Sequence, residues 1–134
     1  MADFDISSAQ QEDVLTLAFS GVSTPQNAAA MTRRYFDIVL ASGTKKVLAD
    51  IRTLQGRLSI ADTFFLLRDL PVKPAPVGIR TAVVESEKNR AYGIFLETTA
   101  ANAGVEIKCF FDRAEALAWL GKPDARARDK AETA

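Results

Sequence analysis

The segment from Lys45 to Leu70 constrains the fold more than any other part of the chain, because it joins an apolar stretch, a polar loop and a second apolar stretch. Residues 47–51 are apolar almost without interruption, which is typical of a strand covered on both faces. Residues 59–70 have the length and apolar content of a helix, and Pro71 cannot continue it. This order predicts a layered fold with the strand at 47–51 in the interior of a sheet.

The residues before this segment predict a hairpin and a helix. Strands are expected at Phe4–Ser7 and Val14–Ser20, since the second alternates apolar residues like a half-buried strand and a polar turn separates the two. Thr24 offers a side-chain cap, and Pro25 has the backbone angle of a first helical position. The pattern therefore predicts a helix at about 25–42.

The residues after the segment continue the alternation of strands and helices. A second apolar strand is expected at Gly78–Val84, followed by a helix at about 87–103. Val105–Phe111 alternates apolar and charged residues, as a half-exposed edge strand does. The last predicted helix begins with a capping box at Asp112 and stops at Gly121.

This order of elements predicts an α/β fold. An opening pair of strands, followed by strands that alternate with helices, requires crossover connections, so the later strands are expected to be parallel. We expect one domain at residues 1–121, with a mixed, mostly parallel sheet of about five strands, an N-terminal antiparallel hairpin and about four helices. The prolines of segment 71–76 predict a stiff extended connection, and residues 122–134 predict a flexible C-terminal tail.

Composition and charge exclude several classes of function. Lys and Arg balance Asp and Glu at 17 each, so a general attraction to nucleic acid phosphates is not expected. One cysteine and no histidine exclude an intrachain disulfide, a zinc site built on His or several Cys, and an imidazole base. No metal or cofactor is expected. Because neither a signal-peptide pattern nor a run of about 18 apolar residues occurs, a cytoplasmic protein is expected, with peripheral membrane attachment as an alternative.

The best candidate for a binding site lies where two predicted strands end. Asp50 and Arg52 bracket the carboxyl end of the first strand, where open parallel sheets place their ligand crevices. Gly56 allows the following loop to approach a ligand closely, and Glu85 and Ser86 end the neighbouring strand at the same rim. Alternatively, Asp50 and Arg52 bind each other and only order the loop. No catalytic set of nucleophile, acid and base can be assembled, so an enzyme is not expected.

The predicted helix at 59–70 carries more apolar side chains than one face can bury. Phe64, Phe65 and Leu66 are consecutive, whereas a helix on a sheet buries a single stripe. The surplus is expected to be covered by the rest of the chain, by a second copy or a protein partner, or by a lipid-like ligand or membrane surface. An amphiphilic ligand with an anionic head near Arg52 and its apolar part under the helix, against Phe64 and Phe65, would use both features.

Three segments of the chain carry a resemblance to a known family: KKVLADIRTLQG at 45–56, IRTAVVE at 79–85 and FLETTAANAGVEIKCFFDRAEALAWL at 95–120. Together with the helix after the first of them, they resemble the SpoIIAA-like branch of the STAS superfamily, the sulfate transporter and anti-sigma factor antagonist domains. The similarity spans about residues 4–121. It implies a small α/β domain that binds protein partners or small ligands, in some members nucleotides or lipid-like molecules, and usually performs no chemistry.

The resemblance also suggests a switch. In that superfamily a Ser or Thr in an Asp-Ser-Ser-Gly-type turn opens the second helix and is phosphorylated by a partner kinase. This chain has Arg57-Leu58-Ser59-Ile60 there, so Ser59 is a candidate phosphorylation site at a helix N-terminus. The residues themselves favour a cap alone, as the pattern Ser-x-x-Asp with Asp62 predicts, and phosphorylation is the alternative.

Residues and resemblance together lead to one expectation about function. The chain is expected to be a non-enzymatic STAS-like regulatory or binding module. Its protein partner, a second copy of itself, or a small amphiphilic or anionic ligand (lipid-like or nucleotide) would bind at the crevice between the strand end at Asp50 and helix 59–70. A phosphorylation-controlled switch at Ser59 and a peripheral, lipid-binding protein are the alternatives.

Overall fold

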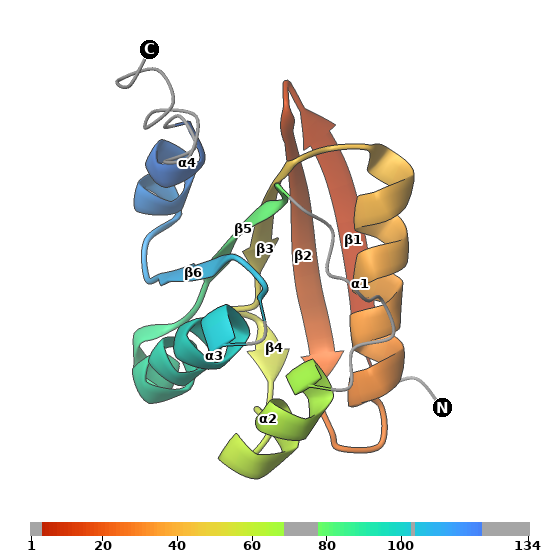
Figure 1. Cartoon of the computed structure of the whole chain (residues 1–134), viewed down its shortest axis with the longest axis vertical. Helices are drawn as coiled ribbons and strands as arrows, with labels where there is room; N and C mark the ends of the chain where they lie inside the picture. Colours follow the sequence, from red (N-terminus) through yellow and green to blue (C-terminus); the bar gives the residue numbers. More distant parts are fainter. Residues whose placement is uncertain (1–3, 69–77, 103, 122–134) are drawn as a thin grey trace.

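A mixed sheet forms the centre of the molecule (Figure 1). The computed structural model describes residues 4–68, 78–102 and 104–121. Within them the strands are β1 (Phe4–Gln11), β2 (Val14–Val22), β3 (Lys46–Asp50), β4 (Leu54–Gln55), β5 (Arg80–Val84) and β6 (Ile107–Phe110). Their order across the sheet is β1-β2-β3-β5-β6, and β4 pairs with the end of β2. The β1–β2 pair is antiparallel and the other pairs are parallel, which confirms the predicted fold class.

The opening hairpin is longer than the sequence predicts. β1 pairs with β2 from Phe4 to Gln11, whereas apolar patterning indicates a strand only as far as Ser7. Residues 8–11 are small or polar and exposed, so they carry no hydrophobic signal. Because strand formation at a sheet edge depends on the neighbouring strand as well as on the residues themselves, pairing with β2 extends β1. Glu12, with a φ of 56°, lies in the turn.

β3 lies in the interior of the sheet and β6 at an edge, as predicted. β3 pairs with β2 on one side and with β5 on the other, and Val47, Leu48 and Ala49 are all buried. Among the described strands β6 pairs only with β5, and its Lys108 is exposed. The contrast between a continuous apolar run and an alternating one therefore identifies interior and edge correctly.

Helices cover both faces of the sheet. They are α1 (Ala28–Ser42), α2 (Ile60–Arg68), α3 (Arg90–Asn102) and α4 (Arg113–Gly121), with a short 3₁₀ helix, Glu87–Asn89, before α3. Met31 of α1 and Leu96 of α3 share a core cluster with Val47, while Leu120 of α4 packs with Leu48. Since successive strand residues point to opposite faces, α1 and α3 cover one face and α4 the other. α2 lies beside α3 (Figure 1).

Two helix starts differ from the prediction by three residues each. α1 begins at Ala28 rather than at residue 25, because Thr24 and Asn27 first form a turn in which each side chain accepts the other's backbone N–H, at 3.1 and 2.9 Å. The predicted helix at 87–103 is divided into the 3₁₀ turn and α3. The reciprocal bonds between Thr24 and Asn27 close the turn before α1. The N-cap of α1 is Asn27 and its side chain makes no cap hydrogen bond, so the predicted cap at Thr24 is wrong.

α2 starts at Ile60, one residue after the predicted start, and is described as far as Arg68. The predicted end of this helix at residue 70, the proline connection at 71–76 and the tail at 122–134 lie outside the described residues. None of the helices within the described ranges combines the length and the apolar character that crossing a bilayer requires.

Candidate functional site

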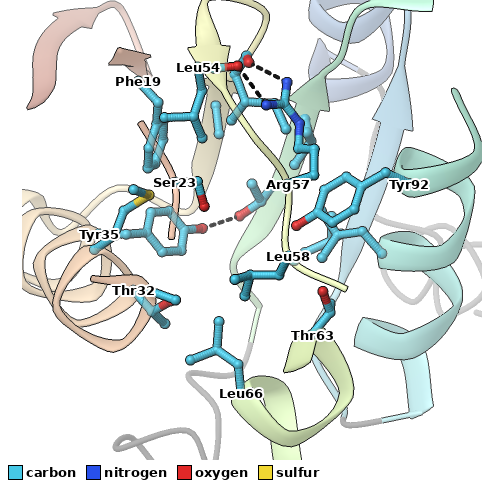
Figure 2. Close-up of a pocket in the computed structure, with 18 of the residues that line it drawn as sticks. Phe19, Ser23, Thr32, Tyr35, Leu54, Arg57, Leu58, Thr63, Leu66 and Tyr92 are labelled. Carbon is cyan, nitrogen blue, oxygen red and sulfur yellow. Dashed lines mark hydrogen bonds between the residues drawn. The ribbon is translucent and has the colours of Figure 1, made fainter. Parts of the chain in front are cut away.

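A cavity of about 150 Å³ lies beneath α2, between α1 and α3 (Figure 2). Its sheet side is formed by β2, β3 and β5, through side chains such as Phe19, Ala49 and Val83. Leu58 and Leu66 face it from the side of α2. The lining is mostly apolar, and the cavity lies near the carboxyl ends of parallel strands, where open α/β sheets bind ligands.

A buried ion pair fastens the loop between β3 and α2 to the sheet. Arg57 donates two hydrogen bonds to the carboxylate of Glu85, at 2.7 and 2.8 Å, and the Glu85 side chain is 0% exposed. The other N–H groups of the Arg57 guanidinium donate to the backbone carbonyls of Ile51, Leu54 and Gly56, at 2.8, 2.6 and 2.7 Å. A guanidinium has five N–H donors, and here all five are used. Arg57 therefore lines the cavity without offering a free donor to a ligand.

Tyr35 and Thr81 bring a second polar pair to the cavity wall. Their hydroxyl oxygens are 2.6 Å apart, between α1 and β5 (Figure 2). Burial raises the pKa of the Tyr35 phenol to about 12, although the bond with Thr81 acts in the opposite direction. The phenol is therefore neutral at ordinary pH, and these two hydroxyls satisfy each other.

Thr63 carries the fully buried polar side-chain atom of the described lining that lacks a partner. It is 1% exposed, and among the described residues its Oγ1 has no hydrogen bond. An unpaired buried hydroxyl costs about 1–3 kcal/mol. Figure 2 shows this hydroxyl directed from α2 toward the space beside Leu58 and Tyr92. Burial raises the pKa of the Tyr92 phenol overall, and the nearby Thr63 hydroxyl acts in the opposite direction. The two hydroxyls do not meet hydrogen-bond geometry.

Asp50 and Arg52, the main candidates from the sequence, bind each other outside this lining. The Arg52 side chain donates to both carboxylate oxygens of Asp50, at 3.0 and 2.8 Å, and its backbone N–H donates to one of them at 3.1 Å. Burial favours a higher pKa for Asp50, but the hydrogen bonds from Arg52 lower it overall. These contacts fit the alternative in which the pair orders the loop, and a role in ligand binding stays a prediction.

Gly56, Ser59 and Ser86 have local contacts. Gly56 has a φ of 80°, and a Cβ there would lie 2.8 Å from the Ser23 carbonyl oxygen, so its close approach is to the chain itself. Ser59 Oγ accepts the backbone N–H of Asp62 at 3.1 Å, as a helix cap does. Ser86 donates its backbone N–H to the Glu85 carboxylate at 2.7 Å. Gly56, Ser59 and Ser86 stand outside the described lining.

The apolar residues of α2 divide between its two sides. Leu66 lines the cavity, whereas Ile60 and Phe65 are 68% and 49% exposed. The side chain of Phe64 lies outside the described part of the structure. The surplus of apolar surface predicted for this helix is therefore present on its outer side.

Sequence reasoning missed Arg57, Thr63 and the two tyrosines as parts of the site. One signal for Arg57 was available, because Glu85 follows directly on the buried strand β5 and a carboxylate in that position needs a cation. No comparable signal marks Thr63, since a single threonine among apolar helix residues is ordinary.

The described residues offer little for catalysis. Burial, followed by the charges of Glu85 and Glu97, raises the pKa of Cys109 to about 12, so its thiol is not poised as a nucleophile. Within the described ranges no group of three or more Cys, Asp or Glu side chains is placed to hold a metal ion. The site offers apolar surface and neutral hydroxyls.

Comparison with known proteins identifies the fold. No family model and no curated protein matches the chain. An anti-sigma factor antagonist from Mycobacterium paratuberculosis superposes with a TM-score of 0.61 at 13% identity, over 89% of this chain and 95% of that one. An uncharacterised DUF3478-family protein with a SpoIIAA-like fold, from Shewanella loihica PV-4, gives 0.54 at 21%, over 87% and 93%. The chain therefore has a SpoIIAA-like fold, as the resemblance implies.

Proposed function

We propose that this chain is a non-enzymatic regulatory module that binds a small ligand beneath α2 and presents the outer side of α2 to a protein partner. The observation that carries the proposal is the cavity of about 150 Å³ between α1, α3 and α2. Apolar cavities with a few convergent polar groups are the usual form of a ligand site. A ligand that contacts α2 from inside would shift the equilibrium between positions of this helix.

The chemistry of the lining supports binding rather than catalysis. Its described ionisable side chains are Arg57, Tyr35 and Tyr92. Arg57 is fully engaged with Glu85 and three carbonyls, and the pKa values of both tyrosines are raised by burial. A general base or nucleophile needs a pKa near the working pH, and burial moves the pKa values of these two tyrosines further from it.

Two observations support a protein partner. One similar structure is an anti-sigma factor antagonist, a name that denotes action through another protein. Ile60 and Phe65 give the outer side of α2 an exposed apolar character, and such surface is common where proteins associate. The partner would be another protein or a second copy of this chain.

Native mass spectrometry of the protein purified from its host tests both parts. We expect wild type to retain a small molecule, a bound protein or a second copy. Two adjacent substitutions separate the sides of α2: Leu66→Ala should release the small molecule and keep the protein complex, whereas Phe65→Ser should do the reverse. A bare monomer, combined with no effect of either substitution, would show that the proposal is wrong.

A second candidate, a phosphorylation switch, is favoured by one observation. Ser59 is exposed at the start of α2, where its Oγ already contacts the Asp62 N–H, so a phosphate there would meet helix N-terminal amides. Incubation with host lysate and ATP, followed by peptide mass spectrometry, should then find phosphate on Ser59, with Ser59→Ala as the control. Absence of phosphate at this residue would leave Ser59 as a cap alone.

A further inference from the structure

The size of the cavity limits the ligand to a small group. An apolar cavity of about 150 Å³ in another protein stays dry and accepts benzene, and the cavity beneath α2 is of the same volume. Its walls from α1, α3 and the sheet include Met31, Phe36, Leu96 and Val83. The ligand, or the part of it that enters, is therefore about the size of one six-membered ring.

The charges around the cavity exclude an anionic head as the buried group. Arg57 is the cation of the described lining, and each of its five donors already bonds to Glu85 or to a backbone carbonyl. The sequence suggests that the anionic head of an amphiphilic ligand lies near Arg52, but Arg52 is bound to Asp50. An ionised carboxylate or phosphate would therefore be buried without a counter-charge, which is strongly unfavourable.

One fully buried polar atom of the described lining has no hydrogen-bond partner. Thr63 Oγ1 is buried, has no hydrogen-bond partner among the described residues, and points toward the space beside Tyr92 (Figure 2). Buried hydroxyls nearly always have a partner, so this exception requires an explanation. The other hydroxyl pair of the lining, Tyr35 and Thr81, is closed on itself at 2.6 Å.

We propose that the cavity binds a neutral, ring-sized molecule with one hydroxyl or carbonyl group, which hydrogen bonds to Thr63. The polar group of the ligand lies beside Tyr92, and the remainder of the ligand contacts the apolar walls. The inference rests on the proposed function, because it names the ligand class of the same site. It replaces the amphiphile with an anionic head that the sequence suggests.

Three probes of similar size test the ligand class: phenol, benzene and benzoate. Binding is followed by amide and methyl NMR signals of Thr32 and Leu96 on opposite cavity walls, with the amide of exposed Glu12 in the β1–β2 turn as a control outside the lining. Phenol and benzene should shift the wall signals, and benzoate should not. In Thr63→Val, which keeps the shape of the side chain, the ratio of phenol affinity to benzene affinity should fall about tenfold.

A measurement without ligand gives an independent check. Thr63→Val removes an unpaired buried hydroxyl and should raise the melting temperature. Thr81→Val is the matched control, because it removes a hydroxyl that is bonded to Tyr35, and it should lower the melting temperature. Equal losses in the two variants would mean that the Thr63 hydroxyl has a partner in the free protein, and this would overturn the proposal.

The outcomes separate this inference from the proposed function. If the probes shift the wall signals but the affinity ratio is unchanged, or if benzoate binds best, the ligand class is wrong and the binding function stands. If no probe shifts the wall signals, the inference is wrong. Should native mass spectrometry then also show a bare monomer, the proposed function fails with it.

Discussion

Replacing Arg57 by leucine tests whether the buried ion pair holds the site together. The substitution removes five hydrogen bonds, of which two go to Glu85 and three to backbone carbonyls of the loop after β3. Among the described residues, the Glu85 carboxylate, which is 0% exposed, would keep bonds only from Ser86, whose backbone nitrogen lies 2.7 Å away. A buried charge would thus lose its counter-charge.

The expected cost follows from that loss. Removing one partner of a buried pair costs about 3–5 kcal/mol, against a total stability of about 5–15 kcal/mol for a domain. Replacing both Arg57 and Glu85 by leucine should cost less than the sum of the single changes, by about 2 kcal/mol, because no unpaired charge remains. Part of the loss should persist in the double variant, since the loop carbonyls still lack their donor.

Urea unfolding followed by circular dichroism measures these differences. Arg52→Leu is the matched control, because the Arg52–Asp50 pair has similar geometry but its side chains are 42% and 19% exposed. An exposed pair contributes about 0–1 kcal/mol. Arg57→Lys, which keeps the charge but not the fork of donors, should lie between Arg57→Leu and wild type. If Arg57→Leu costs no more than Arg52→Leu, the reasoning is refuted.

Three further predictions concern single elements. In the same assay Ser59→Ala should cost about 0.5–2 kcal/mol through loss of the cap, and Ser59→Asp should stay near wild type; equal losses would contradict the capping role. Burial raises the pKa of Tyr35 from its ordinary value of 10 to about 12 in the folded chain. The unfolded chain therefore releases this proton first, stability should fall between these pH values, and Tyr35→Phe should weaken that dependence, as alkaline unfolding curves will show. Backbone amides should exchange more slowly in Val47–Ile51 than in Glu106–Cys109, and the reverse order would contradict the interior position of β3.

The fold was predictable from the sequence where burial decides the structure. A continuous apolar run identified β3 as an interior strand, and alternation identified β6 as an edge strand. The second half of β1 was not predictable, because its polar residues are ordered by pairing with β2 rather than by burial. Patterning detects what a segment buries, and it is insensitive to what a neighbouring strand supplies.

The residues that line the cavity were not predictable from the sequence. Asp50 and Glu85, which the sequence suggests as site residues, are outside the described lining, and their role in binding stays a prediction. The position of Glu85 after a buried strand indicates that it needs a cation, but the sequence does not indicate which one, because Arg57 is 28 positions away and a loop arginine ordinarily points to solvent. Only the folded chain brings the guanidinium under the loop, where the carbonyls of that loop complete its coordination.

α2 shows most clearly why the rest could not be derived. Successive helical residues are about 100° apart, so Thr63 and Leu66 face one side and Phe65 the other. The side that faces the cavity contains a threonine with an unpaired hydroxyl, while a phenylalanine on the opposite side is 49% exposed. A helix optimised only for stability would have the reverse arrangement. Departures of this kind are expected where a segment serves binding. Apolar patterning alone therefore does not show which side of such a helix faces the cavity.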